Sequence, residues 1–462
     1  MKAIRGGTVV ESTWSGPADV VIDGETIVAV TAPGAPTHGV TEEIDATGKL
    51  VLPGGVDPHC HVGFTSGEFT SLDRYPECTA AALFGATTTI VDFAIPRPGA
   101  RPLDAAREQL AKIPAGLCDA ALHGCVVDWD ESVPMQLRHM ADAGIRTIKM
   151  FTTYAGESMA DEHTILNTMR ATRDLGGMVL IHCESDAIVV DAQNRCAAIG
   201  TVDAGHMADT RPELAETSSV AAILAIAESQ QAPVYFVHQS TPDAVDLVVD
   251  ARKRGVVAFT ETVAHHLTLD DSRYAQDDPE RFVCCPPLRR RDVVDELGSR
   301  LLLGSVTTVG SDHCCYDTRQ KQKHQHDVRA MPNGLPGVET RLPVIFSRFV
   351  NDLGMSPSRF VEVTATNPAI TNGLYPRKGS LLPGSDADIA IWDADREWVV
   401  TRAGLHMATD YTPYEGMRLR GRPEQVFLRG ELVIADGELV SDVPRGRYVP
   451  AAPMDFASIR AI

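Results

Sequence analysis

The chain has 462 residues, of which 44% are hydrophobic and 23% are charged, and its formal net charge is −20. This length and composition are typical of a globular enzyme with one large domain and a smaller one, and the negative charge argues against binding to nucleic acids or anionic membranes. The first residues lack the apolar core of a signal peptide, and no apolar run approaches the length of a membrane span, so we expect a cytoplasmic protein.

Both ends of the chain consist of short β-type segments broken by glycine and proline. Two β-rich ends around a long middle predict one small β-sandwich, formed by residues 1–50 together with residues 377–462. The segments that indicate it are 18–22, 26–30, 388–392, 425–428 and 432–434.

Residues 51–376 alternate between continuous apolar runs and helical patterns. This alternation is typical of a parallel sheet covered by helices, and eight runs predict a (β/α)8 barrel. The predicted fold class is therefore α/β, a TIM-like barrel with a small β-sandwich from both chain ends. The eight runs are 51–56, 88–95, 120–128, 147–151, 178–183, 233–238, 256–263 and 306–310.

Two histidines end the first apolar run, in the sequence Val-Leu-Pro-Gly-Gly-Val-Asp-Pro-His-Cys-His over residues 51–61. His59 and His61 are two positions apart on an extended segment, so both imidazoles point to the same face. They can bind one metal ion at the carboxyl end of a strand, where barrel enzymes place their chemistry.

Four further strands of the predicted barrel end in a polar side chain that can bind metal. Each has an ordinary structural explanation, such as a hydrogen-bonded core histidine or a helix cap, but the coincidence of all of them at strand ends favours one shared site. These residues are Lys149 on the fourth strand, His182 on the fifth, His238 on the sixth and Asp312 on the eighth.

Lys149 indicates that the site holds two metals. A buried lysine favours the neutral amine, which can take up carbon dioxide and become a carbamate with two oxygen ligands. Such a group can bridge two metals about 3.5–4 Å apart, the spacing of two-metal hydrolases. Nitrogen and oxygen ligands without thiolate favour Zn²⁺, with Mn²⁺ and Co²⁺ as alternatives.

Six segments spread over nearly the whole length resemble the cyclic amidohydrolases of the amidohydrolase superfamily, in particular D-hydantoinase and dihydropyrimidinase. They are Pro-Gly-Gly-Val-Asp-Pro-His-Cys-His (53–61), Lys-Met-Phe-Thr-Thr-Tyr (149–154), His-Cys-Glu (182–184), Gly-Ser-Asp-His-Cys (310–314), Pro-Asn-Gly-Leu-Pro-Gly-Val-Glu-Thr-Arg (332–341) and Asp-Tyr-Thr-Pro-Tyr-Glu-Gly (410–416).

The resemblance implies how the ligands are shared between two divalent metal ions. Carboxylated Lys149 would bridge the two ions. The more buried ion would be bound by His59, His61 and Asp312, and the other by His182 and His238.

The resemblance also implies three residues that bind the substrate. Tyr154 would bond the substrate and stabilise the oxyanion. The family's Cys-Ser-Pro-Pro-Leu-Arg segment, which grips the amide edge of the ring, is Cys-Cys-Pro-Pro-Leu-Arg over residues 284–289 here, so Cys285 replaces the usual serine. Asn333 would add a backbone contact.

The activity that follows is hydrolytic ring opening of cyclic amides or ureides, namely 5-substituted hydantoins or dihydropyrimidines, to N-carbamoyl amino acids. A hydroxide shared by both metals would attack the ring carbonyl, while Asp312 would move a proton to the leaving nitrogen. The resemblance further implies a homotetramer, and no nucleic acid or membrane partner is expected.

Two other functions stay open. An allantoinase or another cyclic imide hydrolase would use the same metal ligands, and a non-catalytic dihydropyrimidinase-like scaffold protein would have lost them. A dihydroorotase is disfavoured because Gly63 stands where that enzyme carries an arginine. His265 and His266, after the seventh run, are expected to serve loop structure or hydrogen bonding.

Overall fold

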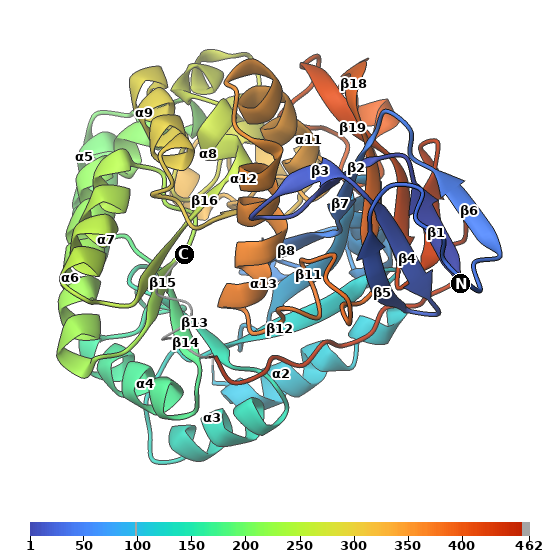
Figure 1. Cartoon of the computed structure of the whole chain (residues 1–462). Helices are drawn as coiled ribbons and strands as arrows, with labels where there is room; N and C mark the ends of the chain where they lie inside the picture. Colours follow the sequence, from blue (N-terminus) through green and yellow to red (C-terminus); the bar gives the residue numbers. More distant parts are fainter. Residues whose placement is uncertain (98, 455–462) are drawn as a thin grey trace.

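The computed structural model describes residues 1–97 and 99–454, and its largest unit is a barrel of eight parallel strands (Figure 1). The last strand lies beside the first, where the Cys60 and His313 backbones form a parallel bridge. The predicted barrel is thereby confirmed. In spatial order its strands are β8 (Gly55–Cys60), β11 (Thr87–Phe93), β12 (Asp119–Cys125), β13 (Thr147–Phe151), β14 (Met178–His182), β15 (Val234–Phe236), β16 (Ala258–Val263) and β17 (Thr308–Gly310).

Helices cover the outside of the barrel, which explains why its strands are buried on both faces. Helix α7 shows how the sequence sets a boundary: the Thr241 side chain accepts a hydrogen bond from the Ala244 N–H, and Pro242 occupies the first turn. The longer helices are α1 (Tyr75–Phe84), α2 (Pro102–Leu110), α3 (Val133–Asp142), α4 (Glu162–Asp174), α5 (Asp186–Ala198), α6 (Glu213–Gln230), α7 (Pro242–Lys253) and α9 (Arg291–Leu302). The short ones are α8 (Ala264–Thr268), α10 (Thr318–Gln322), α11 (Arg341–Ile345), α12 (Pro357–Val361) and α13 (Asn367–Thr371).

The chain ends form two further sheets beside the barrel, as predicted (Figure 1). Side chains such as Val20, Ile389 and Phe427 pack into a shared apolar core. The four-stranded sheet has the order β5 (Thr26–Thr31), β4 (Asp19–Asp23), β1 (Lys2–Arg5) and β6 (Glu42–Asp45). The seven-stranded sheet has the order β21 (Glu438–Leu439), β20 (Glu431–Ala435), β19 (Arg418–Leu428), β18 (Ile389–Val399), β7 (Leu50–Pro53), β2 (Thr8–Val10) and β3 (Ser15–Pro17).

The apolar run 51–56 serves two sheets instead of forming one barrel strand. Its first half is β7, which pairs with β18, whereas β8 begins at Gly55. A side chain at Gly54 would come within 2.2 Å of the Thr88 hydroxyl, so the chain passes between the sheets at a point of close approach. The division of the chain at residues 50 and 377 stays a prediction.

The segment before residue 454 returns from the sandwich to the amino-terminal end of the barrel. The Val449 N–H donates to the Ala120 carbonyl at 2.8 Å, and the Met454 N–H donates to the Gly176 carbonyl at 3.0 Å. This segment therefore closes the end of the barrel opposite to the predicted metal ligands. Within the described parts of the chain, no helix is long and apolar enough to cross a membrane.

Candidate active site and metal centre

Three of the predicted metal ligands meet at the carboxyl end of the barrel. Nε2 of His59 lies 3.3 Å from Nε2 of His61, and these atoms lie 3.0 and 3.3 Å from Oδ1 of Asp312. Ligand atoms at about 2.0–2.2 Å from one ion are roughly 3–3.5 Å from one another. The donor set and its spacing therefore fit a single divalent metal ion.

The other two histidines lie next to this group. The ring centroids of His182 and His238 are 4.5 Å apart, and His238 is 5.4 Å from His59. His182 ends β14, and His238 lies just after β15. The ends of four barrel strands thus bring the four histidines and Asp312 together, as the sequence predicts.

Lys149 on β13 is fully buried within the same group. Its Nζ atom lies 5.1 Å from the ring centroids of both Phe93 and Phe151, and the Phe93 ring also stacks on His61. Burial lowers the pKa of Lys149 to about 8, partly offset by the charge of Asp312. Its positive charge adds to burial in lowering the pKa of His61, His182 and His238.

The three ligands around the first metal position differ in how their surroundings shift their pKa values. Burial alone would lower the pKa of His59, but Asp312 and Glu261 outweigh burial and raise that pKa to about 9. Burial lowers the pKa of His61 to about 4. The pKa of Asp312 lies well below its ordinary value, because His59 outweighs the effect of burial.

Two acidic residues that the sequence reasoning missed hold the histidines in place. Oε1 of Glu261 lies 2.6 Å from Nδ1 of His59 and accepts the backbone N–H of His238 at 3.0 Å. Oε2 of Glu184 lies 2.6 Å from Nε2 of His182 and accepts a hydrogen bond from Arg211 at 2.6 Å. Carboxylates of this kind orient metal-binding imidazoles. The available signals were an acidic residue two positions after His182 and another within the buried barrel strand 258–263.

Three of the predicted site residues have an unusual backbone conformation. The φ angles of Tyr154, His238 and Asp312 are 70°, 37° and 48°. Few residues other than glycine adopt this left-handed region, and such strain is concentrated at functional sites. The surrounding fold therefore holds these side chains in directions that a relaxed strand end would not give them.

A cavity of about 240 Å³ opens beside the predicted substrate-binding residues. Tyr154, Arg211 and Asn333 all line it. The Arg211 guanidinium lies 5.2 Å from the centroid of the Tyr154 ring. Burial raises the pKa of the Tyr154 hydroxyl, and the neighbouring thiol of Cys285 raises it further. The structure thus brings Tyr154, Cys285 and Asn333 to one region.

One buried polar atom at the cavity has no hydrogen-bond partner. Oδ1 of Asn333 is buried and unpaired among residues 1–97 and 99–454, as are both side-chain amide atoms of Gln239 and Nδ1 of His238. Buried polar groups in folded proteins are nearly always paired, so the unpaired Asn333 oxygen beside the cavity points to a ligand there. Gln239 was not predicted from the sequence.

Comparison with known proteins agrees with this geometry. The model of the amidohydrolase family matches residues 50–433. The chain belongs to the amidohydrolase family. It is similar to the D-hydantoinase of Ralstonia pickettii, with 35% identity covering 96% of this chain and 98% of the relative. It is also similar to the dihydropyrimidinase of Rattus norvegicus, with 33% identity covering 97% of this chain and 88% of the relative.

Solved structures of similar proteins have the same fold. The crystal structure of dihydropyrimidinase from Brevibacillus agri has a TM-score of 0.95 and 35% identity, covering 98% of this chain and 99% of that chain. The L-hydantoinase of Arthrobacter aurescens has a TM-score of 0.88 and 27% identity, covering 97% and 99%. The resemblance inferred from the six sequence segments is therefore confirmed, and the chain is a hydrolase.

Proposed function

We propose that this amidohydrolase opens cyclic amides and ureides by hydrolysis. The substrate class is 5-substituted hydantoins and dihydropyrimidines, and the products are N-carbamoyl amino acids. The observation that carries the proposal is the meeting of four histidines, Asp312 and a buried lysine at one end of the barrel. The names of the similar proteins support the choice of substrate class.

The proposed cofactor is a pair of divalent metal ions, preferably Zn²⁺. His59, His61 and Asp312 would hold one ion and His182 and His238 the other, with carboxylated Lys149 between them. The lowered pKa of Lys149 supports carboxylation, because carbamate forms from the neutral amine. When bound, the two ions would supply Lewis acidity and a water molecule acidic enough to act as nucleophile near neutral pH.

Among the side chains of the protein, Asp312 would transfer the proton and Tyr154 would stabilise the developing oxyanion. Asp312, whose low pKa keeps it ionised, would accept a proton from the attacking water and deliver it to the ring nitrogen that leaves. The Tyr154 hydroxyl, whose raised pKa keeps it protonated, would donate a hydrogen bond to the carbonyl oxygen as negative charge develops there.

Backbone groups of Cys285 and Asn333 would hold the amide edge of the ring. Burial raises the pKa of the Cys285 thiol to about 11, so this side chain stays neutral, like the serine that it replaces. The cavity beside Tyr154 and Asn333 would receive the substituent of the ring. Its wall contains both apolar side chains, such as Val189 and Met207, and charged ones, such as Arg329.

The quaternary structure and location that we propose are a cytoplasmic homotetramer. Family resemblance supports the tetramer, and the composition of the chain supports the location. Light scattering after size-exclusion chromatography would test the assembly: a tetrameric mass is expected, and a monomeric mass would contradict it.

A turnover assay with metal-loaded enzyme tests the proposed activity. The assay would compare hydantoin, 5-substituted hydantoins, dihydrouracil, allantoin and succinimide, with Asp312→Asn as the inactive control. We expect the hydantoins or dihydrouracil to give the highest kcat/KM. A preference for allantoin would favour an allantoinase instead, and no ring opening of any compound would refute the proposed substrate class.

A further inference from the structure

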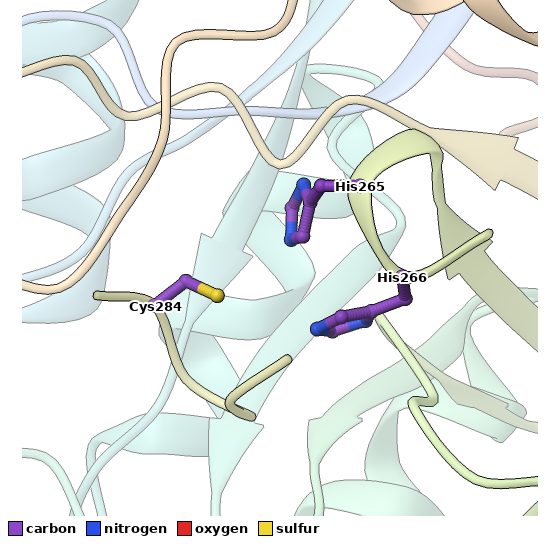
Figure 2. A group of neighbouring side chains, drawn as sticks. All are labelled: His265, His266 and Cys284. Atoms are coloured by element: carbon purple, nitrogen blue, oxygen red, sulfur yellow. The ribbon is translucent and has the colours of Figure 1, made fainter. Parts of the chain in front are cut away.

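A second group of metal-binding side chains lies outside the six residues above. His265, His266 and Cys284 each offer one donor atom, and these atoms lie within 4.8 Å of one another. The histidines belong to α8, which directly follows β16, and the cysteine comes from a loop nearly 20 residues later. Figure 2 shows the three side chains gathered around a common space. All three are at most 2% exposed.

His265 has a donor atom that the fold does not use. Its Nε2 is buried and has no hydrogen-bond partner in the described parts of the chain. Leaving a polar atom unpaired in the interior destabilises the fold, so proteins seldom retain one without a ligand. The sequence-based expectation of a hydrogen-bonding role therefore does not account for this nitrogen.

Another group of three donor residues, by contrast, contains a histidine whose ring nitrogens are both hydrogen-bonded. Asp73, His313 and Cys315 also offer three donor atoms within 4.8 Å. There, Nε2 of His313 lies 2.8 Å from Oδ2 of Asp73, and Nδ1 accepts the Gly337 N–H at 3.1 Å. Both ring nitrogens are thus engaged in holding the loops together, and no capacity remains for a cation.

We propose that His265, His266 and Cys284 form a third cation site, separate from the catalytic pair, for a soft or borderline divalent cation such as Cd²⁺ or Zn²⁺. Two imidazoles and one thiolate suit such cations, whereas Mg²⁺ and Ca²⁺ require oxygen ligands. No residue of this site is among the six proposed catalytic ligands.

Cys284 would bind as a thiolate, so its proton must leave when the cation enters. Burial and the neighbouring Cys285 raise the pKa of the Cys284 thiol, against the opposing charges of Lys321 and Arg289, so the thiol stays protonated until a cation displaces its proton. In the metal-free protein the thiol lies 3.3 Å from the Pro286 carbonyl oxygen, and Nε2 of His266 lies 3.1 Å from the same atom. Binding would release the thiol proton to solvent and replace these two weak hydrogen bonds with bonds to the cation.

The test is a titration of the zinc-loaded enzyme with Cd²⁺, followed by ultraviolet absorption. A thiolate bound to Cd²⁺ gives a charge-transfer band, which the nitrogen and oxygen ligands of the catalytic pair cannot give. We expect a band that saturates at one Cd²⁺ per chain and is absent in Cys284→Ser. His265→Gln should bind Cd²⁺ at least about tenfold more weakly, because it removes one ligand.

The matched control is Cys314→Ser, another buried thiol close to Lys321 but outside the group. It should keep the full band. Absence of a band in the wild type, or a band that survives in Cys284→Ser, would overturn the proposal. His265→Gln retains the thiol, so its weaker binding cannot be explained by a missing cysteine, and circular dichroism checks the fold of each variant. Turnover is not the readout, so the outcome is independent of the proposed function.

Discussion

At the amino end of the barrel a buried lysine is surrounded by carboxylates, whereas at the carboxyl end a buried lysine lies among histidines and aromatic rings. Nζ of Lys378 lies 2.7 Å from carboxylate oxygens of both Asp119 and Asp388. These carboxylates raise its pKa above the ordinary value in spite of burial, which would lower it. Lys149, which has no such contact in the described chain, has a lowered pKa.

The comparison shows how one fold separates stability from chemistry. Asp119 begins β12 in the barrel, and Asp388 directly precedes β18 in the seven-stranded sheet, so the Lys378 ion pairs join the barrel to the sandwich. Arg429 adds a hydrogen bond to Asp119. At the amino end of the barrel, carboxylates of the protein balance the charge of the buried lysine. At the carboxyl end, we expect a ligand to balance the buried charges.

Lys149→Ala should have the largest effect. Without the bridging carbamate, kcat should fall at least about 1,000-fold, since several kcal/mol of transition-state stabilisation depend on the paired metals. Elemental analysis should show fewer metal ions per chain, and small carboxylic acids should restore part of the activity. The exposed Lys112, changed to alanine, is the control. Full activity in Lys149→Ala would remove the carbamate from the mechanism.

Lys378→Met should reduce stability and leave catalysis intact. Removing one member of a buried ion cluster leaves carboxylates without a partner, which costs about 3–5 kcal/mol. Urea unfolding would measure the loss, and kcat of the folded variant should stay within about twofold of the wild type. Arg447→Ala breaks the exposed pair with Glu25 and should cost no more than about 1 kcal/mol. Equal effects of the two variants would contradict the proposed role of burial.

Glu216→Gln should change how stability depends on pH. Burial raises the pKa of Glu216 from 4.5 to about 7, although Arg289 opposes the shift. Between these values the folded protein keeps a proton that the unfolded chain has released, so stability falls as pH rises from about 4.5 to 7, by up to about 3 kcal/mol. The loss is complete above the folded pKa.

Unfolding curves at several pH values would measure this dependence. Glu216→Gln should show a flatter profile than the wild type between pH 4.5 and 7. Glu213→Gln, on the same helix but much more exposed, should keep the wild-type profile. A wild-type slope that persists in Glu216→Gln would assign the titration to another group.

Glu261→Gln should have the smallest effect of the four. It replaces the carboxylate 2.6 Å from Nδ1 of His59 with a neutral amide, and changes of this kind lower metal affinity about 10–100-fold. Competition with a chelator would measure the affinity. Glu228→Gln at the surface is the control. An unchanged affinity would mean that packing alone orients His59.

Local features made much of the fold and site predictable. An apolar run followed by a polar residue is a property of a few neighbouring positions, and it placed His182 and Asp312 at strand ends before any tertiary information was used. The same locality explains the error at residues 51–56: a run of apolar residues indicates burial but does not say which sheet buries it.

Contacts between residues far apart in the sequence could not be predicted from such local patterns. Glu261 meets His59 across 202 positions, and Asp119 meets Lys378 across 259. Neither carboxylate belongs to a short motif, and each would be an ordinary acidic residue if its partner lay elsewhere.

The sequence by itself determined the order of strands and helices, the composite sandwich and the residues offered at each strand end, because these depend on periodicity and on neighbouring side chains. Only the tertiary structure decided which buried charges are matched and which are left open. That distinction depends on distances between side chains from separate elements, which closure of the barrel and docking of the sandwich fix.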